Sequence, residues 1–161
     1  MKSRLAVILI LLFGGMLMVG VSAGVYASDQ DSKSKPFIDT LTGLWVYKYP
    51  EVCAEYEGGD AGLLYDVAMM LSDVFKGYSF KGVGGYRLSV QFVITADGKV
   101  IGARPYPIKG VGISEYNRRI ADYINSSPDV LRKWKPGNVN GENVNEIYII
   151  YGHVRLQGTL D

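Results

Sequence analysis

Apolar positions along the chain change their spacing several times, and each spacing predicts a different element. Between Asp60 and Gly77 they recur at steps of three and four, which predicts an amphipathic helix. The apolar face consists of Leu63, Leu64, Val67, Met70, Leu71, Val74 and Phe75. Asp60 is placed to cap the first free N–H groups of this helix, and Gly77 is placed to end it in the left-handed conformation.

Residues 86–95 alternate apolar and polar side chains, which predicts a half-buried strand. The Asp97-Gly98 pair that follows predicts a tight turn, because type I′ and related hairpin turns require positive φ. Residues 100–106 are therefore expected to return as the partner strand, and Pro105 ends the pairing because proline has no N–H to donate.

A second helix is expected to begin near Ser114, whose hydroxyl can cap it, and to end before Pro128. Its core side is predicted to carry Ile113, Tyr116, Ile120, Tyr123 and Ile124. Residues 41–49 suggest a strand that ends at Pro50. Residues 144–156 form the longest β-prone run and predict a final strand that is covered on both faces for part of its length. These elements together predict an α+β fold, in which a small antiparallel sheet made of the hairpin and the long final strand packs against two helices.

The amino-terminal segment predicts either an export signal or a membrane anchor. Lys2 and Arg4 precede an uncharged apolar run over residues 5–21, and no further charge occurs before Asp29. Cleavage after Ala27 is the preferred interpretation, because small residues stand at the spacing that signal peptidase requires. The alternative is an uncleaved helix, since residues 5–27 are also long enough to cross a bilayer about 30 Å thick.

Both interpretations place the rest of the chain outside the cytoplasm. The expected division is a signal peptide or anchor over residues 1–27, a linker over 28–43 and a domain over 44–161. The 17 Lys and Arg residues nearly balance the 16 Asp and Glu residues, so the overall charge offers no general attraction for nucleic acid or for an anionic membrane. Contact with the inner membrane is expected only if the leader is uncleaved.

The side chains that catalysis and metal binding use are scarce. His153 is the only histidine and is expected to be structural or surface-exposed. Cys53 is the only cysteine, which excludes an internal disulfide, and it is expected to be buried and inert. Glu142 and Glu146 are interpreted as part of a solvated face. We expect no catalytic residue, no metal site and no cofactor.

Several segments in a fixed order resemble one protein family. EYEGGDAGL at residues 55–63 precedes VQFVITADGKVIGARPY at 90–106, and WKPG, an Asn-Gly step and HVRLQ follow between residues 134 and 157. Together they resemble the carboxy-terminal domain of TonB-type energy transducers of the Bacteroidota type, over about residues 50–157. The residues that match the family motifs are Gly58, Gly59, Asp97, Gly98, Trp134, Pro136, Gly137 and Gly141.

The WKPG segment also has a physical interpretation as a corner. Trp134 adds apolar bulk beside the sheet, Pro136 prevents a helix from continuing, and Gly137 is expected to take a reversed backbone. The Asn140-Gly141 step then turns the chain into the last strand. The alternative is that Trp134, with the lysines on either side of it, forms a ligand-binding face.

The resemblance implies a binding activity and no enzymatic reaction. Such domains receive the TonB box, an extended segment at the amino end of an outer-membrane transporter, as an added strand. By this resemblance, we expect the last strand to bind the peptide. The expected partner-binding residues are Asn145, Ile147, Tyr148, Ile149, Ile150 and Tyr151. The alternative is an exported structural or assembly protein that forms a homodimer through the same edge, without energy transduction.

The chain departs from the family in its spacer and leader. The family's spacers are long and rich in proline, whereas residues 28–54 contain only two prolines, Pro36 and Pro50. As a flexible coil, these residues span roughly 30 Å. Residues 1–27 lack the histidine that works with the proton-driven motor. Asn117 stands where the family usually has alanine. The resemblance therefore supports the fold more strongly than it supports energy transduction.

Overall fold

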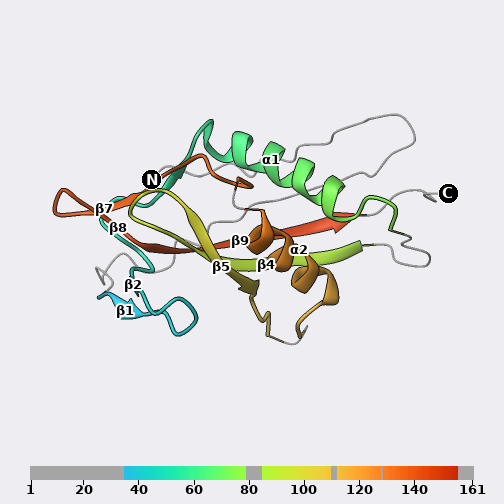
Figure 1. Ribbon diagram of the computed structural model, residues 1–161, viewed down its shortest axis with the longest axis horizontal. Helices are drawn as coiled ribbons and strands as arrows, with labels where there is room; N and C mark the ends of the chain where they lie inside the picture. Colours follow the sequence, from blue (N-terminus) through green and yellow to red (C-terminus); the bar gives the residue numbers. More distant parts are fainter. Residues whose placement is uncertain (1–34, 79–84, 110–111, 128, 156–161) are drawn as a thin grey trace.

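A computed structural model describes residues 35–78, 85–109, 112–127 and 129–155 (Figure 1). The described part contains two helices and several small antiparallel sheets, which is the expected α+β class. The elements are β1 (Phe37–Ile38), β2 (Trp45–Val46), β3 (Glu55–Tyr56), α1 (Gly59–Val74), β4 (Gly85–Ile94), β5 (Val100–Pro105), α2 (Glu115–Ser126), β6 (Trp134–Lys135), β7 (Gly137–Val139), β8 (Glu142–Val144) and β9 (Glu146–Arg155). The leader over residues 1–27 and the first part of the expected linker lie outside the described residues.

The central sheet has the strand order β5-β4-β9, and both pairings are antiparallel. β4 pairs with β9 over ten residues without a shift, from Gly85 opposite Arg155 to Ile94 opposite Glu146. The pairing of β4 with β5 contains one irregularity, between Gln91 and Val93. Among the described strands, β9 therefore forms one edge of this sheet and β5 forms the other.

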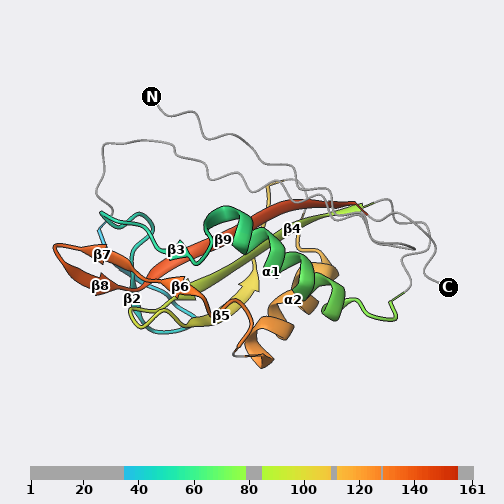
Figure 2. The same ribbon diagram turned by 90° about the horizontal axis from the view of Figure 1, so that it is seen from above.

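Both helices contribute to a core on one face of the sheet (Figure 2). Every second residue of β4 points into this core, as the alternating pattern predicts. The buried cluster includes Leu63, Val67, Met70 and Leu71 of α1, Leu88, Val90, Phe92 and Ile94 of β4, Ile120 and Ile124 of α2, and Ile150 and Val154 of β9. The core therefore joins elements from almost the whole described chain.

The helix ends confirm part of the sequence prediction. Ser114 caps α2, because its hydroxyl accepts a hydrogen bond from the Tyr116 N–H at 3.1 Å. The prediction that Ile113 lies in the core is wrong, since 48% of its surface is exposed. α1 begins at Gly59, with Gly58 in the left-handed conformation as its N-cap, so Asp60 lies in the first turn and does not cap the helix. Gly77 has the expected positive φ, 74°, but it lies in the turn after α1, which ends at Val74 with Phe75 as its C-cap.

An amino-terminal strap, residues 37–49, crosses the face of the sheet that the helices leave uncovered. Asp39 contacts Arg104 on β5, at one edge of the sheet, and Tyr47 forms a parallel bridge to β9 at the other. Val46 of the strap and Val93 of β4 are fully buried and lie outside the helix-side cluster, so apolar side chains are also buried away from the helices.

The structure of the strap and of the sheet beneath it differs from three predictions. Residues 37–43, expected to be linker, are part of the folded body, which therefore begins before residue 44. The strand expected over residues 41–49 is limited to β2, which pairs with β1. β4 is buried more extensively than predicted, because Ser89 and Val93 on its other face are inaccessible, although Arg87 on that face is exposed as expected.

The corner formed by the WKPG segment brings distant family-motif residues together. A Cβ on Gly98 would lie 2.5 Å from the Trp134 carbonyl oxygen, so the β4–β5 turn packs directly on this segment. Asp97 lacks positive φ, so the turn is not type I′. Gly98 has a φ of 79°, which suits glycine.

Gly137 does not have the reversed backbone that we expected. It lies in β7, and a Cβ there would be 2.8 Å from the Glu146 carboxyl and 3.2 Å from the Val52 carbonyl oxygen. Glycine is needed at this position for close packing. Asn140 and Gly141 both have positive φ, but they connect β7 to β8 and not directly to the last strand.

Two asparagines of α2 take the place of strand partners. Asn117 accepts a hydrogen bond from the Ser89 N–H at 3.2 Å and donates to the Arg87 carbonyl at 3.1 Å, where β5 no longer accompanies β4. Asn125 makes the same pair of bonds with the N–H and carbonyl of Ala103, at 2.9 and 2.8 Å. The side chain of Asn117 is buried, whereas that of Asn125 is exposed.

Replacing Asn117 by alanine is expected to lower the free energy of unfolding by about 2 kcal/mol, because the buried Ser89 N–H and the partly buried Arg87 carbonyl lose their partner. Asn125→Ala is the matched control. It should cost less, about 1 kcal/mol, since water can replace the exposed amide. Urea unfolding of the two variants measures the difference. Equal losses would show that burial of the Asn117 amide does not matter.

Candidate strand-binding edge

The outer edge of β9 presents backbone groups on alternate residues. The Ile147 N–H donates to the Tyr47 carbonyl at 2.9 Å, which fixes the outward direction for Ile147. Because the pairing of β4 with β9 is regular, the backbone groups of Ile149, Tyr151 and His153 point the same way. Beyond the Tyr47 bridge, no strand among the described residues pairs with this edge.

The expected partner-binding residues divide between the edge and the core. The backbones of Ile147, Ile149 and Tyr151 face outward, although Ile147 is already engaged by Tyr47. Ile150 is buried in the helix-side cluster. The Tyr148 ring lies 5.7 Å from Phe92 and 4.7 Å from Trp134, measured between ring centroids, and is half-buried. Tyr148 and Ile150 therefore fix the position of the strand and leave its outer edge open.

Asn145 is engaged within the chain and cannot serve as an open binding residue. Its side-chain oxygen accepts a hydrogen bond from the Ala96 N–H at 2.9 Å, and its amide donates to the Trp45 carbonyl at 2.9 Å. Its own carbonyl accepts from the Tyr47 N–H at 2.8 Å. Asn145 thus ties the β4–β5 turn and the strap to the start of β9.

Tyrosines gather beside the open part of the edge. Tyr151 lies on the strap side of the sheet, and its ring centroid is 5.8 Å from that of Tyr106. Burial, together with Tyr106 and Tyr49, raises the pKa of Tyr151 to about 12, so its hydroxyl keeps its proton at neutral pH. Half-buried tyrosines offer apolar contact and a hydroxyl to side chains of an added strand.

Glu146, at the first position of β9, is a buried carboxyl group. It is 4% exposed, and its Oε2 accepts a hydrogen bond from the Ala54 N–H at 2.6 Å. Burial raises the pKa of Glu146 to about 7, although hydrogen bonds from Ala54 and from the Cys53 thiol lower it in part. Nothing in the local sequence distinguishes this glutamate from exposed Glu142, so the expectation of a solvated face is wrong for Glu146.

Cys53 also differs from its prediction, because it is exposed and not buried. Its thiol lies beside Glu146 and belongs to the segment that follows Pro50. That segment is held to β7 through two hydrogen bonds between the backbones of Val52 and Asn138, at 2.8 and 3.0 Å. Glu146 therefore connects β9 to the segment that follows Pro50.

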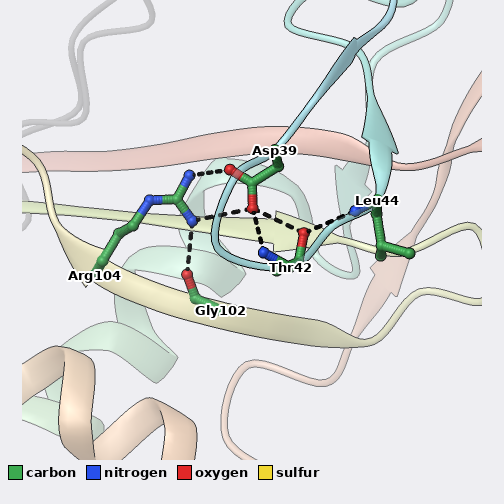
Figure 3. Close-up of polar contacts among 5 residues, drawn as sticks. All are labelled: Asp39, Thr42, Leu44, Gly102 and Arg104. Carbon is green, nitrogen blue, oxygen red and sulfur yellow. Dashed lines mark hydrogen bonds and ion pairs between the residues drawn. The ribbon is translucent and has the colours of Figure 1, made fainter.

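A clasp made of Asp39, Thr42 and Arg104 holds the strap to β5 (Figure 3). The Asp39 carboxylate pairs with the Arg104 guanidinium and accepts hydrogen bonds from the N–H and hydroxyl of Thr42, at 3.0 and 2.7 Å. Arg104 also donates to the Gly102 carbonyl at 3.0 Å. Gly102 has space for the clasp only as glycine, since a Cβ would lie 2.5 Å from Thr42.

The electrostatics of the clasp favour an ionised carboxylate. Burial alone would raise the pKa of Asp39, but the hydrogen bonds from Thr42 and the positive charge of Arg104 together lower it below its ordinary value. The carboxylate is therefore charged at neutral pH and keeps the pair intact. The clasp fixes one end of the strap, and the Tyr47 bridge fixes the other.

Trp134 is a packing residue and does not form a ligand-binding face with its neighbouring lysines. It is buried, and its ring centroid lies 5.0 Å from that of Tyr56 and 6.1 Å from that of Phe92. Lys133 points elsewhere, to Asp66 of α1 at 3.1 Å. Tyr56 also donates its hydroxyl to Asp66, at 2.6 Å. The corner is therefore a structural junction of β3, β6 and α1.

Within the described residues, no three His, Cys, Asp or Glu side chains group as ligands for a metal ion. None of the described helices is long and apolar enough to cross a membrane. Comparison of the chain with known protein families, curated proteins and solved structures gave no match.

Proposed function

We propose that this protein binds an extended peptide, which adds as a strand to the outer edge of β9. The observation that carries the proposal is the edge position of β9, with the backbone groups of Ile149, Tyr151 and His153 directed away from β4. Strand addition uses such groups for affinity and uses side-chain contacts for selectivity. The activity is binding, and no chemical step is involved.

The strap supports the proposal because it already uses the first part of the same edge. Tyr47 donates to the Asn145 carbonyl and accepts from the Ile147 N–H, as a paired parallel strand does. The strap reaches Pro50 three residues later and cannot continue the ladder as a donor there. Among the described residues, none pairs with the edge beyond Ile147, which supports its use by another chain.

The partner that we propose is the TonB box of an outer-membrane transporter, as the family resemblance implies. The protein would then act in the cell envelope, exported to the periplasm or anchored in the inner membrane with its folded part facing the periplasm. The corner of Trp134 and Gly98 supports this assignment, because family-motif residues that lie far apart in the sequence pack on each other. Energy transduction is not part of the proposal.

Self-association is the second candidate function. The part of the ten-residue strand β9 that lies beyond the Tyr47 bridge can pair with the same edge of another copy, in which case no transporter is involved. The observation that favours it is the length of the edge strand. Sedimentation at rising protein concentration detects such a dimer.

An Ile149→Pro variant tests strand addition. Proline removes one outward N–H without removing a donor to β4, and an edge position tolerates it. The affinity for a synthetic TonB-box peptide, measured by isothermal titration, should fall about tenfold, which is the loss of one hydrogen bond. Ile149→Thr keeps the N–H and the branched side chain, so it is the matched control and should bind as the unaltered protein does.

The outcomes of this experiment separate the two candidate functions. Equal peptide affinity for both variants would contradict binding at this edge. If the unaltered protein ignores the peptide but forms a dimer that Ile149→Pro disrupts, the self-association candidate is supported. Thermal unfolding of each variant shows whether the fold is intact.

A further inference from the structure

We propose that the outward side of the β1–β2 hairpin rests on the surface of a lipid bilayer. The hairpin exposes four large apolar side chains, and three of them form what we call the hairpin patch: Ile38 is 52% exposed, Leu41 59% and Trp45 60%. The fourth, Phe37, is 42% exposed and pairs with Val46 on the other side of the hairpin. Ile38 and Trp45 are directly opposite each other in the pairing of β1 with β2, so their side chains lie on one side of the hairpin. Leu41 lies in the turn that connects the two strands.

The hairpin patch is held rigidly although it is exposed. The clasp fixes its turn to β5, and Val46 fills the inner side of the hairpin. The Asn145 amide donates to the Trp45 carbonyl and so fixes the far end. A flexible loop could turn such side chains inward, whereas a fixed hairpin keeps them in contact with the solvent. Exposed apolar groups on a rigid support indicate a contact surface.

Under the second interpretation of the leader, an uncleaved membrane helix, the chain that precedes the hairpin identifies the occupant. Residues 5–28 contain no charged side chain, and 5–27 are long enough to cross a bilayer. Only eight residues lie between Ser28 and Phe37, and this stretch spans at most about 30 Å when fully extended. If residues 5–27 stay in the membrane, the hairpin is therefore confined to the neighbourhood of its surface.

The chemistry of the patch suits the interface of a bilayer. Tryptophan is enriched at the level of the lipid headgroups, where its ring contacts the acyl boundary while its N–H stays hydrated. Leucine and isoleucine contribute apolar area beside it. Lys35, next to the hairpin in sequence and exposed, suits the headgroup region. This inference goes beyond peptide binding and does not depend on it.

Fluorescence quenching by brominated lipid tests the proposal on the full chain in phosphatidylcholine vesicles. The protein has two tryptophans, exposed Trp45 and buried Trp134, so the loss of emission can be assigned. Vesicles that contain brominated acyl chains should quench the unaltered protein, and Trp45→Phe should abolish the quenching. An Ile38→Ser, Leu41→Ser double variant keeps both tryptophans and should show less quenching.

Two results of this experiment would contradict the proposal. Equal quenching of the unaltered protein and Trp45→Phe would show that the signal does not come from the hairpin patch. An absence of quenching in both would show that the patch does not touch lipid, and a concentration-dependent dimer would then assign it to a second copy of the chain. Near-ultraviolet circular dichroism verifies that each variant is folded.

Discussion

Trp134→Ala is expected to lower the free energy of unfolding by about 3–5 kcal/mol, the largest effect of any substitution that we predict. Truncation of a buried tryptophan loses its transfer free energy and leaves a cavity. Trp134 contacts the rings of Tyr56, Phe92 and Tyr148, so the cavity would open where β3, β4 and β9 meet. Denaturant unfolding, followed by circular dichroism, measures the loss.

Trp45→Ala is the matched control, because it removes the same atoms from an exposed position. With 60% of its surface exposed, Trp45 should contribute much less, within about 0.5 kcal/mol. A loss at Trp45 as large as that at Trp134 would mean that the strap, and not the corner, organises the core. The comparison also tests whether the WKPG segment acts as packing, since a ligand-binding tryptophan could be removed at little cost in stability.

The second large effect is a dependence of stability on pH that arises from Glu146. Its pKa is about 7 in the folded protein and near 4.5 when the chain is unfolded. Between these values the folded protein keeps a proton that the unfolded chain has released, so the free energy of unfolding falls as the pH rises. The loss is complete above about pH 7 and amounts to about 3 kcal/mol, since each pKa unit corresponds to about 1.4 kcal/mol.

Glu146→Gln should remove this dependence, because the amide stays neutral at every pH. Its free energy of unfolding should be nearly constant from pH 5 to pH 8, while that of the unaltered protein declines. Glu142→Gln changes an exposed glutamate of β8 and should keep the decline. Urea unfolding at a series of pH values distinguishes the variants. A decline that persists in Glu146→Gln would assign the proton to another group.

At the acid end of the pH range, Asp39 should change the free energy of unfolding in the opposite direction to Glu146. Because its folded pKa is lowered, its contribution to stability is present above its ordinary pKa and is lost as the pH falls further. Asp66 acts in the same direction, since the hydrogen bond from Tyr56 and the ion pair with Lys133 lower its pKa despite burial. The protein is therefore expected to be most stable in mildly acidic solution.

Elements with a strong period were predictable from the sequence. The steps of three and four gave α1, and the alternation gave the helix-side residues of β4, because burial on one face leaves a regular mark. The Ser114 cap and the positive φ of Gly98 were also predictable, since each rests on a local requirement of the backbone. The long final strand followed from its β-branched and aromatic residues.

Features that depend on distant contacts were not predictable. The strap contains only two-residue strands, so it has no period, and it is held by Arg104 from another part of the chain. Burial of Glu146 results from the packing of residues 50–54 and Gly137 around it. Asn145 falls within the predicted final strand and so was expected at the binding edge, yet its side chain makes internal contacts. The sequence alone does not reveal which distant residues these side chains contact.

Amide hydrogen exchange along β9 tests the central claim most directly. In the free protein the N–H groups of Ile149, Tyr151 and His153 should exchange rapidly, whereas those of Tyr148 and Ile150, which face β4, should be protected. A saturating TonB-box peptide should slow the first group and leave the second unchanged. Protection of the outward amides before the peptide is added, or no change when it binds, would contradict strand addition at this edge.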